Sequence, residues 1–308
     1  MTQQFQHLSS HDIVSSFQSL LQAGVITDLD ADETDKTGLD PRYDRQITFW
    51  RSQGFDVVQA KTMLRRLKES RVLVLGCGGM GSMTALNLAT SGVGKLDLVD
   101  SDSVELSNLN RSFIFTERDR GTHKVLAVKE RLLELRSDLK IRTLVKSLKS
   151  QTDVADAVSW SNPDYIVMSV DKPYLHINIW VNRAAISHSV PYSSSGVSQE
   201  QGSLGPVVIP GNPGCFECQG FDMYDDSSAP EAIKDHNANR TAPSFGPMIA
   251  AMGALHATEI IKFLTGSRDP EIRDTQIRIN AQTLSLERIN RHPKGLCDIC
   301  RRRNISAH

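Results

Sequence analysis

The sequence lacks several features that would direct the protein to a membrane or to nucleic acid. Over 308 residues the formal net charge is only −1, so bulk charge favours neither nucleic acid nor an anionic membrane surface. No uninterrupted apolar run comes near the ~20 residues that a membrane span needs. The N-terminus has neither the basic start nor the apolar core of a signal peptide. These absences predict a cytoplasmic protein with no membrane and no nucleic acid among its partners.

Length and composition set the scale of the fold. With 39% apolar residues, the chain can bury a sizeable core. Apolar residues recur at helical spacing over residues 12–24, and an acidic, turn-prone stretch follows over residues 28–40. We therefore predict a short N-terminal helical segment at residues 1–40, which is a candidate for peptide recognition, before a main domain at residues 41–308.

Cysteine is scarce, and four of the five cysteines form two Cys-x-x-Cys pairs, Cys215 with Cys218 and Cys297 with Cys300. In a cytoplasmic chain this spacing favours a metal over disulfides. Together the pairs predict a tetrahedral zinc site with four cysteine ligands, which would be structural because the protein fills all four positions. A redox pair is the alternative, but neither pair lies at the start of a βαβ unit. Cys77 is left as a small packing residue.

One glycine-rich stretch organises the main domain. Residues 72–75 predict a buried strand, a glycine run follows at once, and residues 83–89 predict the first turns of a helix. Such a unit binds nucleotides, because glycine lets the backbone approach a phosphate and the helix N-terminus attracts an anion. By itself the motif is also compatible with NAD or FAD, or with a tight turn only. The glycines are Gly76, Gly78, Gly79 and Gly81.

Polar residues gather after the next predicted strand. Asp100 follows that strand roughly 20 residues beyond the glycines, where a carboxylate would hold a ribose hydroxyl. The loop continues through Asp102 and Asn108 to Arg111, whose guanidinium suits phosphate oxygens. Lys124 begins a further helical pattern. Because a lysine there opposes the helix dipole, we interpret it as a ligand for an anion.

A third apolar strand, at residues 164–170, is followed by Asp171. Parallel strands end at one edge of a sheet, so this second carboxylate should lie beside the nucleotide. It suits Mg²⁺, which prefers one or two carboxylates together with substrate phosphates, although a helix N-cap is the alternative. Further strands are expected at residues 190–196, 205–209, 276–280 and 284–289, with a long core or dimer helix at residues 245–264.

In order and spacing, these motifs resemble the ThiF/MoeB/ubiquitin-activating-enzyme superfamily of ATP-dependent adenylating enzymes. The matching region runs from Arg42-Tyr-Asp-Arg45-Gln-Ile through the glycine run and Asp171 to the second cysteine pair. The resemblance implies an α/β fold with a Rossmann-like doubly wound sheet, a four-cysteine zinc site and a short N-terminal helical segment. An NAD oxidoreductase would explain neither Arg111, Lys124 and Asp171 nor the cysteines.

The resemblance also implies a role for each matching residue. The glycine loop approaches ATP, Asp171 organises Mg²⁺, and a substrate carboxylate attacks the α-phosphate with release of pyrophosphate. Arg45 is expected to reach the ATP site of a second subunit, so the active form would be a homodimer with shared sites. The further residues implied to contact ATP, at the ribose and then at the triphosphate, are Asp100, Asp102, Asn108, Arg111 and Lys124.

Several short matches resemble the branch of this superfamily that modifies ribosomally made peptides, which includes the maturation enzymes of microcin C and pantocin A. One is Gly214-Cys-Phe-Glu-Cys-Gln219. The N-terminal segment resembles only the last part of a leader-recognition fold. No cysteine lies between Cys218 and Cys297, where thioester-forming members carry one. We therefore expect activation of carboxyl groups, glutamate side chains above all, on a precursor peptide, leading to dehydration or cyclisation in antibiotic biosynthesis.

Three other interpretations stay open. The enzyme could adenylate the C-terminus of a peptide, as in the microcin C branch. It could adenylate a sulfur-carrier protein, as MoeB does without a loop cysteine. It could also be a non-catalytic module or half of a heterodimer. The joint presence of Arg45, Asp100, Arg111, Lys124 and Asp171 favours an enzyme.

Overall fold

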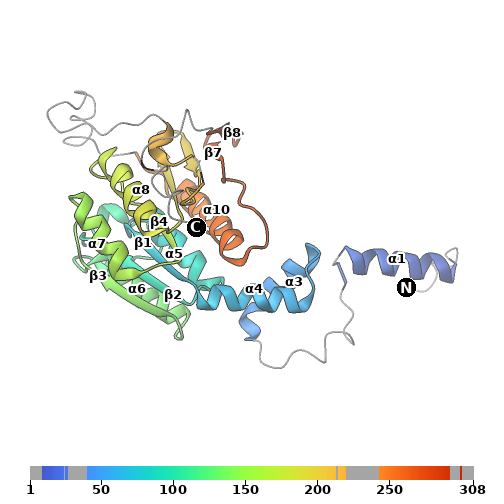
Figure 1. Cartoon of the computed structure of the whole chain (residues 1–308). Helices are drawn as coiled ribbons and strands as arrows, with labels where there is room; N and C mark the ends of the chain where they lie inside the picture. The colour runs from blue at the N-terminus through green and yellow to red at the C-terminus, as the bar shows by residue number, and fades with distance from the viewer. Residues whose placement is uncertain are drawn as a thin grey trace. The chain divides into compact units, whose positions relative to one another are not determined.

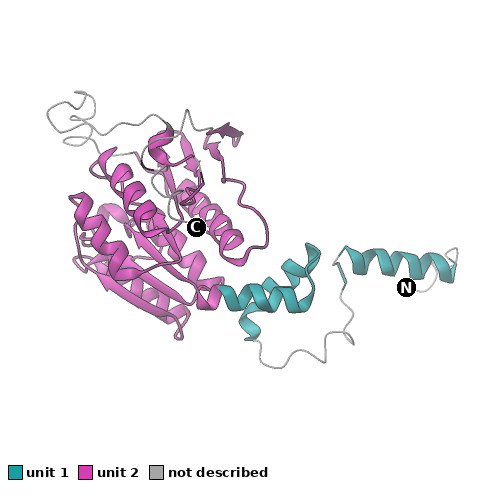
Figure 2. Ribbon diagram, in the orientation of Figure 1, with its two compact units in different colours: residues 1–66 teal, residues 67–308 magenta. Residues whose placement is uncertain are grey.

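The computed structural model describes residues 9–23, 25–26, 40–212, 214–219, 243–291 and 299. Contacts within the chain divide it into two compact units, residues 1–66 and 67–308 (Figures 1 and 2). The domain boundary that we expect after residue 40 stays a prediction. The helices of the first part are α1 (Ser10–Gln22), the 3-10 turn η1 (Pro41–Tyr43), α3 (Asp44–Ser52) and α4 (Val57–Glu69), which crosses the unit boundary.

Helix α1 occupies most of the stretch in which the sequence predicts a helix. It begins at a capping box: the Ser9 hydroxyl accepts a hydrogen bond from the Asp12 N–H at 3.2 Å, and the Asp12 carboxylate accepts one from the Ser9 N–H at 3.0 Å. In the same unit, Ile47 and Trp50 of α3 are buried. Their spacing gives α3 one apolar face.

The second unit is organised around a sheet that, in the described part of the chain, has the strand order β3-β2-β1-β4-β5-β6-β7-β8. Neighbouring strands from β3 to β5 run parallel, and those from β5 to β8 run antiparallel. The parallel part has the order of a doubly wound nucleotide-binding fold, as the sequence predicts. The strands are β1 (Arg71–Leu75), β2 (Lys95–Val99), β3 (Lys140–Leu144), β4 (Tyr165–Met168), β5 (Tyr192–Ser198), β6 (Gln201–Leu204), β7 (Thr275–Asn280) and β8 (Leu286–Asn290).

Helices cover both faces of this sheet (Figure 1). Side chains alternate along the strands, and this alternation separates the faces. Ile166 and Tyr192 belong to the core beneath α7 and α8, whereas Tyr165 and Ser193 contact α10. The helices of this unit are α5 (Gly79–Thr90), α6 (Lys124–Leu135), α7 (Gln151–Ser161), α8 (His176–His188) and α10 (Gly246–Thr265).

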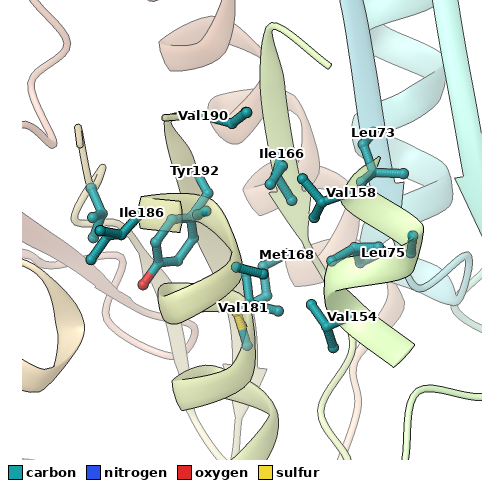
Figure 3. Packing of buried hydrophobic residues seen from close by; sticks show 14 of the residues in the cluster. Leu73, Leu75, Val154, Val158, Ile166, Met168, Val181, Ile186, Val190 and Tyr192 are labelled. Atoms are coloured by element: carbon teal, nitrogen blue, oxygen red, sulfur yellow. The ribbon is translucent and has the colours of Figure 1, made fainter. Parts of the chain in front are cut away.

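The core beneath α7 and α8 consists mainly of aliphatic side chains (Figure 3). Val158 of α7 and Val181 of α8 are fully buried, as are Leu73 of β1 and Ile166 of β4. Burial of each such side chain stabilises the fold by about 1.5–3 kcal/mol. This layer supports the carboxyl ends of β1 and β4, where the predicted site residues lie.

Helix α10 is the described helix that is long and apolar enough, by length and composition, to cross a membrane. In this fold it packs against α5, where a Cβ added to Gly253 would lie 2.7 Å from the Cβ of Met83. His256 and Glu259 interrupt its apolar sequence, and both are buried. Its composition is therefore accounted for by burial against the rest of the unit.

A polar network is buried between α10 and the sheet. One ring nitrogen of His256 lies 2.7 Å from Ser193 Oγ, and the other lies 2.8 Å from Ser195 Oγ. Ser193 Oγ lies in turn 2.6 Å from the hydroxyl of Tyr165. Burial lowers the pKa of His256 to about 3. The ring is therefore neutral at pH 7, so one nitrogen can donate a hydrogen bond and the other can accept one.

Several elements differ from the sequence-based prediction. Residues 205–209 form no strand. Only Val208 pairs, through an isolated bridge to Tyr192, and Pro206 has no N–H to donate to a sheet. Strand β6 lies before this segment instead. Helix α7 was not predicted, and α5 begins at Gly79 within the glycine run rather than at Met83.

Candidate active site

Packing requires glycine at Gly76, in the turn after β1, and at Gly81, in the first turn of α5. Gly76 has a φ of +90°, and a Cβ there would lie 2.7 Å from the carbonyl oxygen of Ser169. A Cβ at Gly81 would lie 1.9 Å from the carbonyl oxygen of Gly76. At Gly78, by contrast, a Cβ would meet no atom within 4 Å. The turn is thus held tightly on one side and leaves room for a bound group at Gly78.

Helix α5 begins in this turn, with Gly78 as its N-cap and no side chain hydrogen-bonded at the cap. The first N–H groups of a helix lack intrahelical partners and lie at its positive end, so they can bind an anion. Nearby, the buried hydroxyl of Ser169 has no hydrogen-bond partner among the described residues. An unsatisfied buried hydroxyl fits a site in which a ligand supplies the partner. Ser169 was missed in the sequence, where it lies inside the strand predicted at residues 164–170.

Asp100 connects the glycine turn to the loop after β2. Its carboxylate accepts hydrogen bonds from the backbone N–H groups of Cys77 and Asp102, each at 2.7 Å. Burial raises the pKa of Asp100, and these two hydrogen bonds oppose the shift. The contact places Asp100 directly beside the glycine turn, which is the position that the sequence predicts for a ribose ligand.

Lys124 lies at the start of α6 and is paired with Asp102. Its Nζ is 2.8 Å from Asp102 Oδ2, and its backbone N–H donates to the carbonyl oxygen of Asp102 at 2.8 Å. The Lys124 side chain is 12% exposed, whereas that of Asp102 is 63% exposed. The exposed Asp102 carboxylate therefore holds the Lys124 ammonium next to the Asp100 loop. An anionic ligand could replace this carboxylate as the partner of the ammonium.

The loop that contains Asn108 and Arg111 runs past the glycine turn. A Cβ at Gly79 would lie 2.8 Å from the carbonyl oxygen of Arg111. The amide oxygen of the buried Asn108 accepts a hydrogen bond from the Glu105 N–H at 3.1 Å, so this side chain also closes the loop. One guanidinium nitrogen of Arg111 donates to the carbonyl oxygen of Ser107.

The remaining predicted ligands are Asp171 and Arg45. Asp171 is exposed in the loop between β4 and α8. Because β4 pairs with β1, with Met168 opposite Leu75, this loop begins at the same edge as the glycine turn. Arg45 is exposed on α3, in the first unit, so its role at the site stays a prediction.

The sulfur atoms of the first cysteine pair lie at a separation compatible with two metal ligands. The Sγ atoms of Cys215 and Cys218 lie 3.6 Å apart, and both residues are buried. Two thiolates on one tetrahedral zinc, at about 2.3 Å each, lie roughly 3.8 Å apart. Cys297 and Cys300 lie outside the described residues, and the described residues alone contain no cluster of three or more metal-binding side chains.

Asn182 of α8, which was missed in the sequence, organises this cysteine pair. It is fully buried, and its amide nitrogen donates to Glu217 Oε2 at 2.8 Å and to Cys215 Sγ at 3.6 Å. Its amide oxygen accepts from the Phe216 N–H and from the hydroxyl of Tyr192, each at 3.1 Å. No periodicity marks this residue, because its partners lie far away in the sequence.

The strand order, the glycine turn after β1 and the carboxylates after β2 and β4 define a nucleotide-binding α/β enzyme domain. The model of the ThiF family matches residues 43–299. The chain therefore belongs to the ThiF family and is an ATP-dependent adenylating enzyme, as the sequence motifs predict.

Curated relatives agree with this assignment. The sulfur carrier protein ThiS adenylyltransferase of Escherichia coli (strain K12) is 34% identical over 206 residues, which cover 67% of this chain and 76% of that protein. The molybdopterin-synthase adenylyltransferase of the same organism is 27% identical over 259 residues, which cover 84% and 95%. The adenylyltransferase and sulfurtransferase MOCS3 of Aedes aegypti is 32% identical, but the chain spans only 43% of its length.

Two solved structures share the fold over nearly the whole chain. E. coli MccB with ATP has a TM-score of 0.77 and 27% identity, with coverage of 96% of this chain and 82% of that chain. PaaA has a TM-score of 0.68 with coverage of 92% and 84%. At 22% identity, the likeness to PaaA concerns the fold alone.

Proposed function

We propose that the enzyme adenylates carboxyl groups, glutamate side chains above all, on a ribosomally made precursor peptide. Activation would lead to dehydration or cyclisation in the biosynthesis of a peptide antibiotic. The observation that carries the proposal is the similarity to MccB, described as a microcin C7 biosynthetic enzyme and solved with N-formylated MccA, at a TM-score of 0.80 over 96% of this chain. The proposal places the enzyme in the cytoplasm.

The described residues support a division of labour at the nucleotide. The open space at Gly78 would let ATP approach the glycine backbone. Asp100 would accept a hydrogen bond from a ribose hydroxyl. Lys124 would leave the Asp102 carboxylate and bind phosphate oxygens instead. Asn108 and Arg111 would bind the same phosphates. Asp171 is the acidic residue of the β4–α8 loop and would hold Mg²⁺, which supplies charge neutralisation at the phosphates. The chain itself therefore contributes positioning and electrostatic stabilisation.

Two further features belong to the same proposal. Arg45 would complete the ATP site of a second subunit, so the active form would be a homodimer with shared sites. Cys215, Cys218, Cys297 and Cys300 would hold a structural zinc ion, which is supported by the 3.6 Å separation of the first two sulfur atoms.

The lack of a cysteine between Cys218 and Cys297 restricts the chemistry after activation. A thioester in that segment is impossible, so the activated carboxyl group would be captured by a nucleophile of the substrate or retained as a nucleotide adduct. Retained AMP on a peptide C-terminus would be MccB-like chemistry. Loss of water with free AMP would indicate internal capture.

A second candidate function is adenylation of the C-terminus of a sulfur-carrier protein. It is favoured by the 34% identity to the ThiS adenylyltransferase. Its acceptor would be a small folded protein that ends in Gly-Gly rather than a short peptide.

The test is incubation with Mg-ATP and any short candidate peptide encoded beside the gene, followed by mass spectrometry. We expect AMP release and loss of one or more waters from the peptide. Asp171→Ala should lower AMP formation by about 100-fold or more, because it removes the proposed metal ligand. Asp156→Ala is the matched control: Asp156 is an exposed aspartate on α7 that pairs with Lys146. AMP formation only with a Gly-Gly carrier protein would favour the second candidate, and no AMP with either acceptor would refute both.

A further inference from the structure

A pocket separate from the nucleotide crevice lies where the sheet changes from parallel to antiparallel. Its volume is about 270 Å³, and its lining includes Tyr174, Asn178, Gln276 and Arg291. None of the glycine-turn residues lines it. Tyr174 lies in the β4–α8 loop that also contains Asp171. The pocket therefore adjoins the loop of the predicted metal ligand and shares no lining residue with the glycine turn.

Charge in this pocket has one sign. Among the described lining residues, Arg291 is the only one that is ionised at pH 7. One of its terminal nitrogens donates to the Gln276 amide oxygen. Its Nε–H is buried and has no acceptor among the described residues. A buried donor without an acceptor is costly, and a carboxylate is the partner that a guanidinium binds best.

The size and the apolar part of the lining restrict the ligand further. A volume of about 270 Å³ is slightly below the roughly 300–1,000 Å³ of pockets that hold whole small molecules. It suits a side chain better than a nucleotide. Met168, Val208 and Phe216 also line the pocket and would contact methylene groups. An acidic side chain with an aliphatic stem would pair with Arg291 through its carboxylate and contact the apolar lining through its methylene groups.

We infer that this pocket binds an acidic side chain of the acceptor peptide through Arg291, next to the carboxyl group that is activated. The inference rests on the proposed adenylation of a peptide. In this proposal the bound carboxylate is not the reacting one, because none of the glycine-turn residues, which would face the nucleotide, lines the pocket. Arg291 is therefore a positioning residue that selects acceptors with neighbouring acidic residues.

The test compares three acceptors: N-acetyl-Glu-Glu-amide and its two forms with one glutamate replaced by glutamine. Substrate-dependent exchange of pyrophosphate into ATP gives the KM of each acceptor. For the wild type, the acceptor that has lost only the anchoring glutamate should have a KM about tenfold or more above that of the doubly acidic one, which corresponds to one lost charge-assisted hydrogen bond. The acceptor that has lost the reacting glutamate should give no exchange. Arg291→Met should remove this KM difference while leaving the KM for ATP unchanged.

Arg288→Met is the matched control, because Arg288 is an exposed arginine of β8 that pairs with Glu271. It should keep the full preference for the doubly acidic acceptor. Gln276→Glu is the second variant, should Arg291→Met fail to fold. It places a carboxylate beside the guanidinium and should also abolish the preference. An unchanged preference in Arg291→Met or Gln276→Glu would overturn the inference.

A measurement without ATP separates this inference from the proposed function. Saturation-transfer NMR should detect N-acetyl-Glu-Glu-amide on the wild type and on Arg288→Met, and not on Arg291→Met. Binding of this kind without any pyrophosphate exchange would refute adenylation and keep the acidic pocket. Exchange with equal binding to wild type and Arg291→Met would keep adenylation and refute the pocket.

Discussion

Replacing Gly81 with alanine tests whether packing requires glycine in the first turn of α5, next to the turn after β1. The added Cβ would lie 1.9 Å from the carbonyl oxygen of Gly76 and 3.0 Å from its carbonyl carbon. An unstrained carbon–oxygen contact is roughly 3.3 Å. The turn and the first residues of α5 would therefore have to separate by more than about 1 Å. The atom in the way is backbone, so no side-chain rotation relieves the clash.

The expected loss of stability follows from two opposing effects. Overpacking of a tight site costs about 1–3 kcal/mol, and the rigid backbone of Gly76, with its φ of +90°, favours the upper end. Alanine regains at most about 1 kcal/mol through its higher helix propensity. Gly81→Ala should therefore lower the free energy of unfolding by about 2 kcal/mol. Gly78→Ala meets no atom within 4 Å and should change it by less than about 0.5 kcal/mol.

Urea unfolding followed by tryptophan fluorescence measures both variants, and calorimetry measures their affinity for ATP. Gly78→Ala should keep its stability but bind ATP more weakly, because its Cβ fills the space that we assign to the nucleotide. Equal unfolding midpoints for the two variants would refute the packing argument. Normal ATP affinity in Gly78→Ala would refute the assignment of the open space.

Three further predictions concern the buried network and the cysteine pair. The pKa of His256 is lowered to about 3, against about 6.5 in an unfolded chain. As the pH falls below 6.5, only the unfolded chain takes up this proton, so stability should fall by up to about 1.4 kcal/mol per pH unit. Urea unfolding at pH 7 and pH 5 should show this slope in the wild type and a smaller one in His256→Gln. Asn182→Ala should cost about 3 kcal/mol, because it removes the buried amide that accepts from the Phe216 N–H and donates to Glu217, whose ion pair with Arg183 remains. Removal of zinc by a chelator should lower the melting temperature, as should Cys215→Ser.

Each of these predictions has an outcome that contradicts it. An identical pH slope in His256→Gln would mean that other groups dominate the acid response. Asn87→Ala is the control for Asn182→Ala, since Asn87 donates to Met83 within one helix; equal losses would deny Asn182 a special role. Purified protein without zinc by elemental analysis would refute the four-cysteine site.

Much of the fold follows from local sequence. Residues 72–75 are a short apolar run that ends at Gly76, and Lys95–Val99 lies between Gly94 and Asp100; they form β1 and β2 as predicted. Asp100 was recognisable because its distance from the glycines is set by one βαβ unit. By contrast, α7 has only a weak apolar face and was missed. Residues 205–209 are apolar enough for a strand, but they form one isolated β-bridge, from Val208 to Tyr192, and no ladder.

The sequence by itself determined the class of enzyme. Each motif of the nucleotide crevice is a short segment that directly follows a strand, so local geometry places its residues at one edge of the sheet. Only the tertiary structure decided how individual side chains are used. Asn108 closes its own loop, and Lys124 is paired with Asp102. The pocket of Arg291 draws on segments from Met168 to β7 and beyond. Such a pocket depends on contacts between residues far apart in the chain, and no periodicity or spacing encodes those contacts.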